Sequence, residues 1–76
     1  MSHVVPLELL ASGESGRVCL LEGVHEQVLR LEEMGLRMGV EVRMLRTGPP
    51  CLLAIDGQRI TFRGGEAIAV FVEVAG

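Results

Sequence analysis

Only one stretch of this chain has the periodicity of a helix, and it lies between segments with the periodicity of strands. Within residues 24–39, four apolar residues recur close to the helical period: Val24, Val28, Leu31 and Met34. Gly35 follows the last of them, where a left-handed C-cap is expected, and Gly23 stands where the N-cap is expected. The sequence therefore predicts one amphipathic helix that ends at Gly35, followed by a short connection through Gly39.

The remaining regular segments are predicted to be strands. Residues 17–22 are one strand, and its central residues 18–21 are apolar without alternation, which is typical of a strand covered on both sides. Four further segments alternate between apolar and polar side chains or follow a turn signal: residues 40–46, 51–56, 59–63 and 67–74. Asp56-Gly57 is a strong signal for a tight hairpin. Residues 1–5 are expected to be a frayed leader, and residues 7–10 a short edge strand or a single turn.

Five short strands and one helix are what a small closed sheet requires. Closure hides the sheet edges, and the helix can cover one open end. We therefore predict a mainly β fold: a five-stranded antiparallel SH3-like barrel with one short helix between the first two main strands. At 76 residues, the chain is expected to form a single domain over residues 1–76.

Composition argues against several classes of partner. The net charge is −3, and all seven basic residues are arginines dispersed from Arg17 to Arg63, which disfavours nucleic-acid binding. The only aromatic residues are Phe62 and Phe71, so the core is expected to be aliphatic. No signal peptide or spanning helix is recognisable, which predicts a cytoplasmic protein. Cys19 and Cys51 are expected to be small buried hydrophobes.

The sequence offers no arrangement suited to catalysis. The two histidines are His3, in the leader, and His25, on the polar side of the helix, and neither is placed to activate a nucleophile. No two carboxylates are spaced as an acid/base dyad, and the glycines lack the arrangement of a phosphate-binding loop. We therefore predict that the protein is not an enzyme.

Metal binding is a separate alternative that rests on the donor inventory. His3, His25, Cys19, Cys51 and the four methionines include soft and borderline donors for a divalent transition metal such as Fe or Zn. No two of them stand at a ligand spacing, so no metal ligand can be assigned. No cofactor is assigned either.

A surface for a protein partner is the other candidate site. Leu29, Leu36 and Met38, with Arg37 between the last two, lie at the edge of the helical stripe or beyond it. Leu52 lies on a strand face that otherwise carries charge. Exposed apolar residues beside arginines are common in interaction modules. The competing interpretation is that Leu29, Leu36 and Met38 fill the junction between the helix and the barrel.

Three motifs together resemble a known family. They read LxxLxxGxxGxV, RLxxMGLxxGxxV and DGxxIxxR, with a Pro-containing turn before the last of them. The residues that carry these motifs and the turn are Leu7, Leu10, Gly13, Gly16, Val18, Arg30, Leu31, Met34, Gly35, Leu36, Gly39, Val42, Pro50, Leu53, Ile55, Gly57, Ile60 and Arg63. The pattern is similar to that of the FeoA family, small cytosolic proteins of bacterial ferrous-iron uptake, and its central segment is the most specific part.

The resemblance implies an SH3-like barrel and an accessory role beside FeoB, a membrane permease with a cytosolic GTP-binding domain. The same fold occurs at the C-terminus of DtxR-type repressors, but this chain lacks their DNA-binding and dimerisation regions. The leading hypothesis is an interaction module that regulates the permease from the cytosol and meets the membrane only through it. The alternative is a small metal sensor or carrier. Self-association through an exposed strand edge is compatible with either hypothesis.

Overall fold

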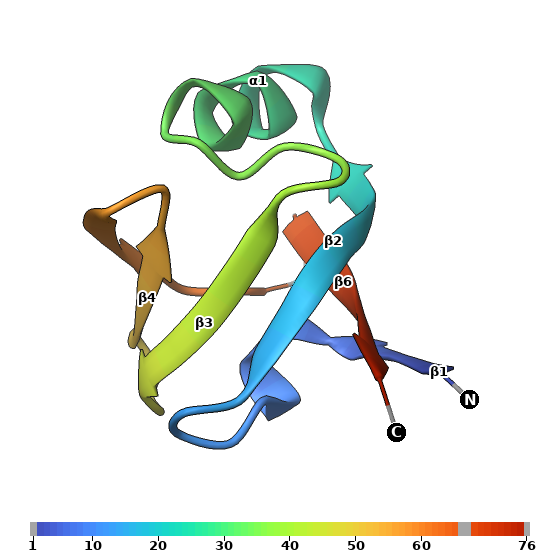
Figure 1. The fold of residues 1–76 in the computed structure, drawn as a ribbon. Helices are drawn as coiled ribbons and strands as arrows, with labels where there is room; N and C mark the ends of the chain where they lie inside the picture. Colours follow the sequence, from blue (N-terminus) through green and yellow to red (C-terminus); the bar gives the residue numbers. More distant parts are fainter. Residues whose placement is uncertain (1, 66–67, 76) are drawn as a thin grey trace.

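The strands pair in one antiparallel sheet with the order β1-β6-β2-β3-β4-β5. The computed structural model describes residues 2–65 and 68–75. In these residues the strands are β1 (Ser2–Pro6), β2 (Ser15–Gly23), β3 (Glu41–Arg46), β4 (Cys51–Ile55), β5 (Gln58–Phe62) and β6 (Ile68–Ala75). A 3-10 turn, η1 (Leu7–Leu9), follows β1, and helix α1 (His25–Glu33) connects β2 to β3. Figure 1 shows α1 above one end of the bent sheet.

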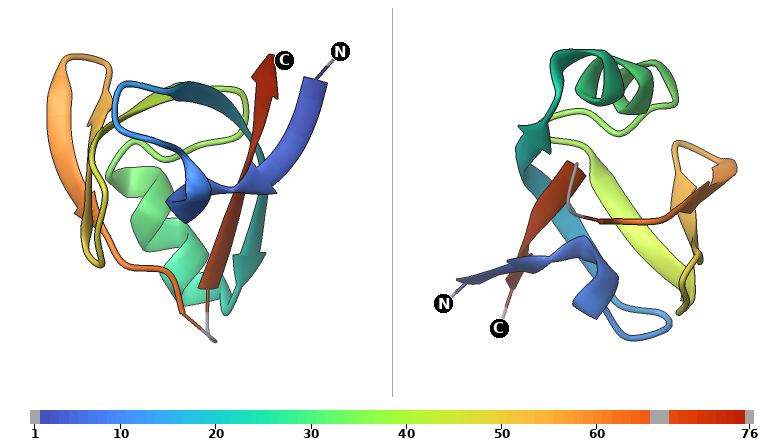
Figure 2. Two further views of the ribbon diagram at one scale, coloured as in Figure 1. Left: turned by 90° about the horizontal axis from the view of Figure 1, so that it is seen from below. Right: turned by 180° about the vertical axis from the view of Figure 1, so that it is seen from behind.

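The mainly β, SH3-like fold with its helix between two main strands is therefore confirmed, with one strand more than expected. Residues 2–5 are not a frayed leader, because β1 pairs with β6 over five positions, from Ser2 opposite Ala75 to Pro6 opposite Phe71. Pro6 suits this place, since proline is tolerated in an edge strand. Within the described residues no ladder joins β5 to β1, so the sheet curls without closing (Figure 2).

The concave side of the sheet encloses an aliphatic core. Its buried members come from η1, every strand except β1, and the helix region: Leu7, Leu10, Val18, Leu31, Leu36, Val42, Met44, Cys51, Leu53, Ile55, Phe62, Val70 and Val72. The predicted alternation of β3 and β4 is confirmed, because their core-facing residues are buried and the residues between them are not. Among the described residues, no helix is both long and apolar enough to cross a bilayer.

The turn between β4 and β5 has the predicted tight hairpin geometry. Asp56 and Gly57 have φ angles of 49° and 77°, which are the left-handed values that a two-residue type I′ turn needs at both central positions. Ile55 lies opposite Gln58 across this turn. The local Asp-Gly signal therefore sets the register of the whole hairpin.

The end of α1 is a Schellman motif that directs the chain into the core. Gly35, with φ of 110°, donates its backbone N–H to the carbonyl oxygen of Glu32 at 3.1 Å. The N–H of Leu36 bonds to the carbonyl oxygen of Leu31 at 2.9 Å, and both leucine side chains are buried. The predicted role of Gly35 is confirmed. The N-cap is Val24 rather than Gly23, because Gly23 still belongs to β2.

Strand β2 contains a bulge that explains why its sequence does not alternate. Val18 lies opposite Val72 and Leu20 lies opposite Phe71, so Cys19 is one extra residue on the β2 side. Val18 therefore faces the core while Leu20, two positions later, faces outward and is 43% exposed. The expectation that this strand is covered on both sides is therefore wrong, because no other part of the described chain covers its outer face at Leu20.

Gly16 of β2 marks a close approach between strands and gives a test of the packing. A Cβ atom built on Gly16 would lie 2.8 Å from Cγ2 and 2.9 Å from Cβ of Val72, whose side chain is fully buried. Gly16→Ala should therefore lower the free energy of unfolding by about 1–3 kcal/mol, the usual effect of overpacking, in urea denaturation.

The matched control is Gly65→Ala, because a Cβ on Gly65 meets no heavy atom of the described residues within 4 Å. This variant should change the free energy of unfolding by less than about 0.5 kcal/mol. Equal effects of the two substitutions would contradict the close approach.

Candidate functional site

The surface beside the end of α1 holds most of the residues that the sequence suggested for partner binding. Leu29 on α1 and Met38 in the following connection are exposed, Met38 by 57%. Arg37 is also exposed, and its Nε donates to the carbonyl oxygen of Glu32 at 2.9 Å. This bond holds the arginine at the helix end, where a cation is favoured by the helix dipole. We call Leu29, Met34, Arg37 and Met38 the helix-end surface.

A groove of about 180 Å³ lies between the end of α1 and the β4–β5 hairpin. It is lined by Glu33, Met34, Gly35, Arg37, Ile55, Asp56 and Gln58. The helix and the hairpin meet closely here, since a Cβ on Gly35 would lie 3.6 Å from Cγ2 of Ile55. The groove combines a methionine with charges of both signs, which suits a protein segment with an apolar and a polar side.

Two of the suggested residues lie elsewhere. Leu36 is fully buried in the core, so its side chain cannot contact a partner while the domain is folded. For Leu36, the alternative that it fills the junction between helix and sheet is the correct one. Leu52 is half-buried on β4 between its register neighbours Arg46 and Thr61, and it does not line the groove.

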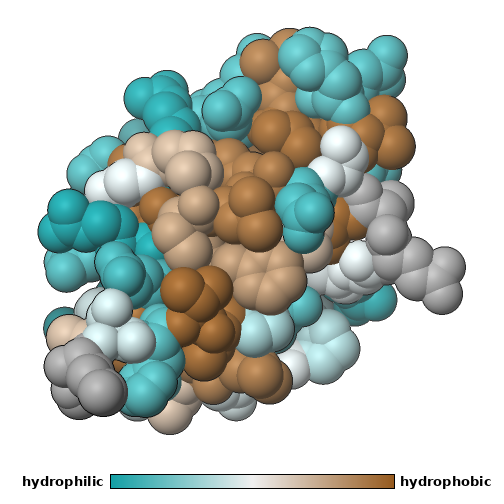
Figure 3. Space-filling view, turned by 90° about the vertical axis from the view of Figure 1, so that its right-hand side faces the viewer, coloured by the Kyte–Doolittle hydropathy of each residue, from teal (hydrophilic) through white to brown (hydrophobic). Residues whose placement is uncertain are grey.

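A second apolar surface covers the outer side of β1, β6 and β2. Pro6, Phe71 and Leu20 are register neighbours and form one apolar row across the three strands. Val4 and Ala69 lie on the same side of the sheet, two positions from this row in opposite directions. We call these five residues the apolar sheet face. Figure 3 shows the continuous hydrophobic area on this side of the molecule.

Sequence reasoning missed the apolar sheet face for two reasons. Its row depends on β1, whose residues the sequence predicts to be a frayed leader, and on the bulge at Cys19, which turns Leu20 outward. One signal was visible, because Ala69 and Phe71 alternate with the core residues of β6. A strand with apolar residues on both faces indicates that something covers the second face.

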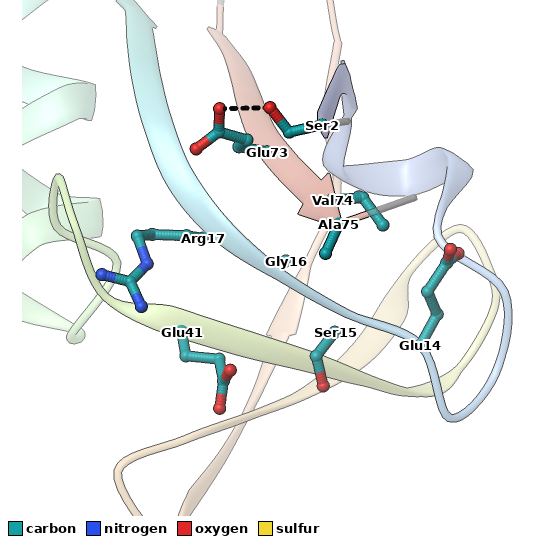
Figure 4. Close-up of a pocket in the computed structure, with 9 residues that line it drawn as sticks. All are labelled: Ser2, Glu14, Ser15, Gly16, Arg17, Glu41, Glu73, Val74 and Ala75. Atoms are coloured by element: carbon teal, nitrogen blue, oxygen red, sulfur yellow. Dashed lines mark hydrogen bonds between the residues drawn. The ribbon is translucent and has the colours of Figure 1, made fainter.

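A hollow of about 480 Å³ lies where β2 runs between β3 and β6. Its lining includes three carboxylates, Glu14, Glu41 and Glu73, and the guanidinium of Arg17. In Figure 4 the three carboxylates lie on different sides of the hollow, and Glu73 accepts a hydrogen bond from the hydroxyl of Ser2 at 2.9 Å. Such separated carboxylates do not form a cation site.

The metal-binding alternative rests on histidines, cysteines and methionines instead. In residues 2–65 and 68–75, no group of three or more His, Cys, Asp or Glu side chains is arranged to hold a metal ion. His3 is exposed on β1 and His25 is exposed at the start of α1. Cys51 is buried as predicted and its thiol donates to the carbonyl oxygen of Phe62 at 3.2 Å. Cys19 is only half-buried.

Comparison with known proteins identifies relatives of this chain. The family model described as FeoA domain matches residues 5–74. A crystal structure of an iron uptake regulatory protein (FeoA) is 28% identical with a TM-score of 0.80, and the match covers 95% of this chain and 100% of that chain. An NMR structure of the FeoA protein from Chlorobium tepidum is 26% identical with a TM-score of 0.74, covering 90% of this chain and 70% of that chain. No curated protein matches the sequence.

The burial of Leu36 and the exposure of Met38 can be tested directly by placing a charge at each position. Leu36→Glu places a charge in the core without a partner and should cost about 4 kcal/mol or more, enough to abolish the folded far-UV circular dichroism spectrum. Met38→Glu changes an exposed side chain and should leave the spectrum and the melting temperature nearly unchanged. A folded Leu36→Glu variant would contradict the core position.

The two thiols should differ in reactivity. Burial raises the pKa of the Cys51 thiol and the negative charge of Glu8 raises it further, although a backbone hydrogen bond partly opposes these effects. A higher pKa leaves less thiolate at a given pH, so Cys51 should react at least about tenfold more slowly with iodoacetamide than the half-buried Cys19. Mass spectrometry of the alkylated peptides measures both rates, and in urea the difference should vanish.

Proposed function

The chain belongs to the FeoA family, and on this premise we propose that it is a cytoplasmic accessory protein that binds the cytosolic part of a FeoB-type ferrous-iron permease. Membership of the family implies a role in ferrous-iron uptake. In the proposal, the chain performs no chemistry of its own. It acts as an interaction module that regulates the activity or the assembly of the permease.

The observation that carries this proposal is the pairing of exposed apolar side chains with a fixed arginine on the helix-end surface. Leu29, Met34 and Met38 expose apolar area, although burying it elsewhere in the fold would have been favourable. Arg37 is already held by its hydrogen bond to the helix end, so little side-chain freedom is lost when it meets a carboxylate of the partner. These properties are those of a preorganised docking surface.

The groove next to this surface supports the same role. It is walled by the helix end and by the β4–β5 hairpin, whose tight turn holds Asp56 in place. Glu33 and Asp56 give the groove two negative charges beside the positive charge of Arg37. A partner segment that carries a basic residue and an apolar residue would therefore find complementary groups here.

We expect calorimetry to detect binding of the full chain to the cytosolic domain of the permease from the same organism. The titration is run with the permease domain in its apo, GDP-bound and GTP-analogue-bound states. Met38→Glu and Leu29→Glu should each weaken the binding at least about tenfold, which corresponds to roughly 1.4 kcal/mol. A dependence on the nucleotide would make the chain a regulator that responds to the state of the permease.

The matched control is Leu9→Glu. Leu9 is 70% exposed in η1, at the other end of the sheet from α1 (Figure 1), and the substitution changes the net charge by the same amount. This variant should bind like the original chain. The proposal is wrong if no nucleotide state binds, and the helix-end surface is wrong if Leu9→Glu weakens binding as much as Met38→Glu does.

A further inference from the structure

The apolar sheet face has charged residues placed symmetrically about its central row. The row consists of Pro6, Phe71 and Leu20. Along β2, Arg17 and Glu22 lie on the outer side at equal distances from this row, because their register partners Glu73 and Ala69 are each two positions from Phe71. Two positions along a strand correspond to about 6.6 Å. The row is thus flanked on β2 by one positive and one negative charge.

This arrangement is complementary to itself. Two copies can face each other through this surface, related by a twofold axis that is parallel to the central row and lies midway between the two sheets. The axis places each side of the row in one copy opposite the other side of the row in the second copy. Arg17 of one copy then faces Glu22 of the other, and this pair forms twice. Glu73 faces the small side chain of Ala69, so its carboxylate does not meet a like charge across the interface.

The individual side chains are compatible with such contacts. Arg17 and Glu22 are both exposed. In Figure 4, Glu73 turns toward Ser2, whose hydroxyl donates to it at 2.9 Å, and Arg17 extends on the other side of β2. Arg17 has a carboxylate as register partner on each neighbouring strand, Glu41 on β3 and Glu73 on β6, and its long side chain turns away from them to reach Glu22 of the second copy. Leu20 and Val4, which are 43% and 59% exposed, supply the apolar area to be buried.

We propose that the apolar sheet face binds the same face of a second copy of this chain, forming a twofold dimer by sheet-on-sheet packing. Two facing sheets pack about 10 Å apart with their strands within about 30° of each other, which brings the two central rows into contact. The dimer explains why β2 and β6 carry apolar residues on both sides. It is separate from the helix-end surface and does not depend on the permease-binding proposal.

The interface is small for a dimer. It consists of five apolar residues and the charged residues beside them, far fewer than the roughly 20–30 residues on each side of a standard specific interface. We therefore expect a dimer that dissociates on dilution through the micromolar range. Sedimentation equilibrium of the full chain over a concentration series measures the dissociation constant.

Charge reversal gives the sharpest test. Arg17→Glu and Glu22→Arg each create two like-charge pairs across the axis, and each should weaken the dimer at least about fivefold. The double variant, with both substitutions, restores opposite charges and should return the dissociation constant to within about twofold of the original. Leu20→Glu should abolish the dimer, because it places two carboxylates on the axis.

Arg30→Glu is the control for the change in net charge, since Arg30 is exposed on α1 and lies outside the face. It should leave the dimer unchanged, and circular dichroism should show all variants folded. A chain that stays monomeric throughout the concentration series would overturn the proposal. So would a dimer that persists in Leu20→Glu, as expected for pairing through the free edge of β1, or a double variant that is not restored.

Discussion

The two hydrogen bonds that end α1 determine how the helix joins the core. They require a left-handed residue at Gly35, and they turn the chain so that Leu36 enters the core beside Leu31. The helix is thereby attached to the sheet at its C-terminal end, although few of its side chains are buried. The same turn places Arg37 and Met38 on the surface. One backbone motif thus separates the residue that holds the helix from the residues offered to a partner.

Where the local sequence determines the geometry, the structure agrees with the prediction. The Asp56-Gly57 turn and the alternation of β3 and β4 needed no knowledge of neighbouring strands. The strand β1 could not be predicted, because residues 2–5 become a strand only by pairing with β6, which lies at the other end of the chain. The burial of Leu36 could have been inferred, since the residue after a Schellman glycine often packs on the last helical turn.

The two candidate surfaces also differ in whether the local sequence could predict them. Leu29, Arg37 and Met38 follow one another closely in sequence, so a pattern along the chain could suggest them. The apolar sheet face is assembled from β1, β2 and β6, whose outer residues become neighbours only through register. Taken together, the two surfaces would let one small domain contact a second copy through its sheet while the end of its helix stays free for a different protein.

The bulge in β2 also bears on how this strand can change in evolution. Without Cys19, the strand would alternate regularly, with Val18 and Leu21 toward the core and Arg17, Leu20 and Glu22 outward. A related chain that lacks this one residue would therefore keep both faces of β2 intact, because the loss of the extra residue removes the bulge and restores the regular alternation. Sequence alignments of the family should therefore accept a one-residue gap in the segment around Cys19.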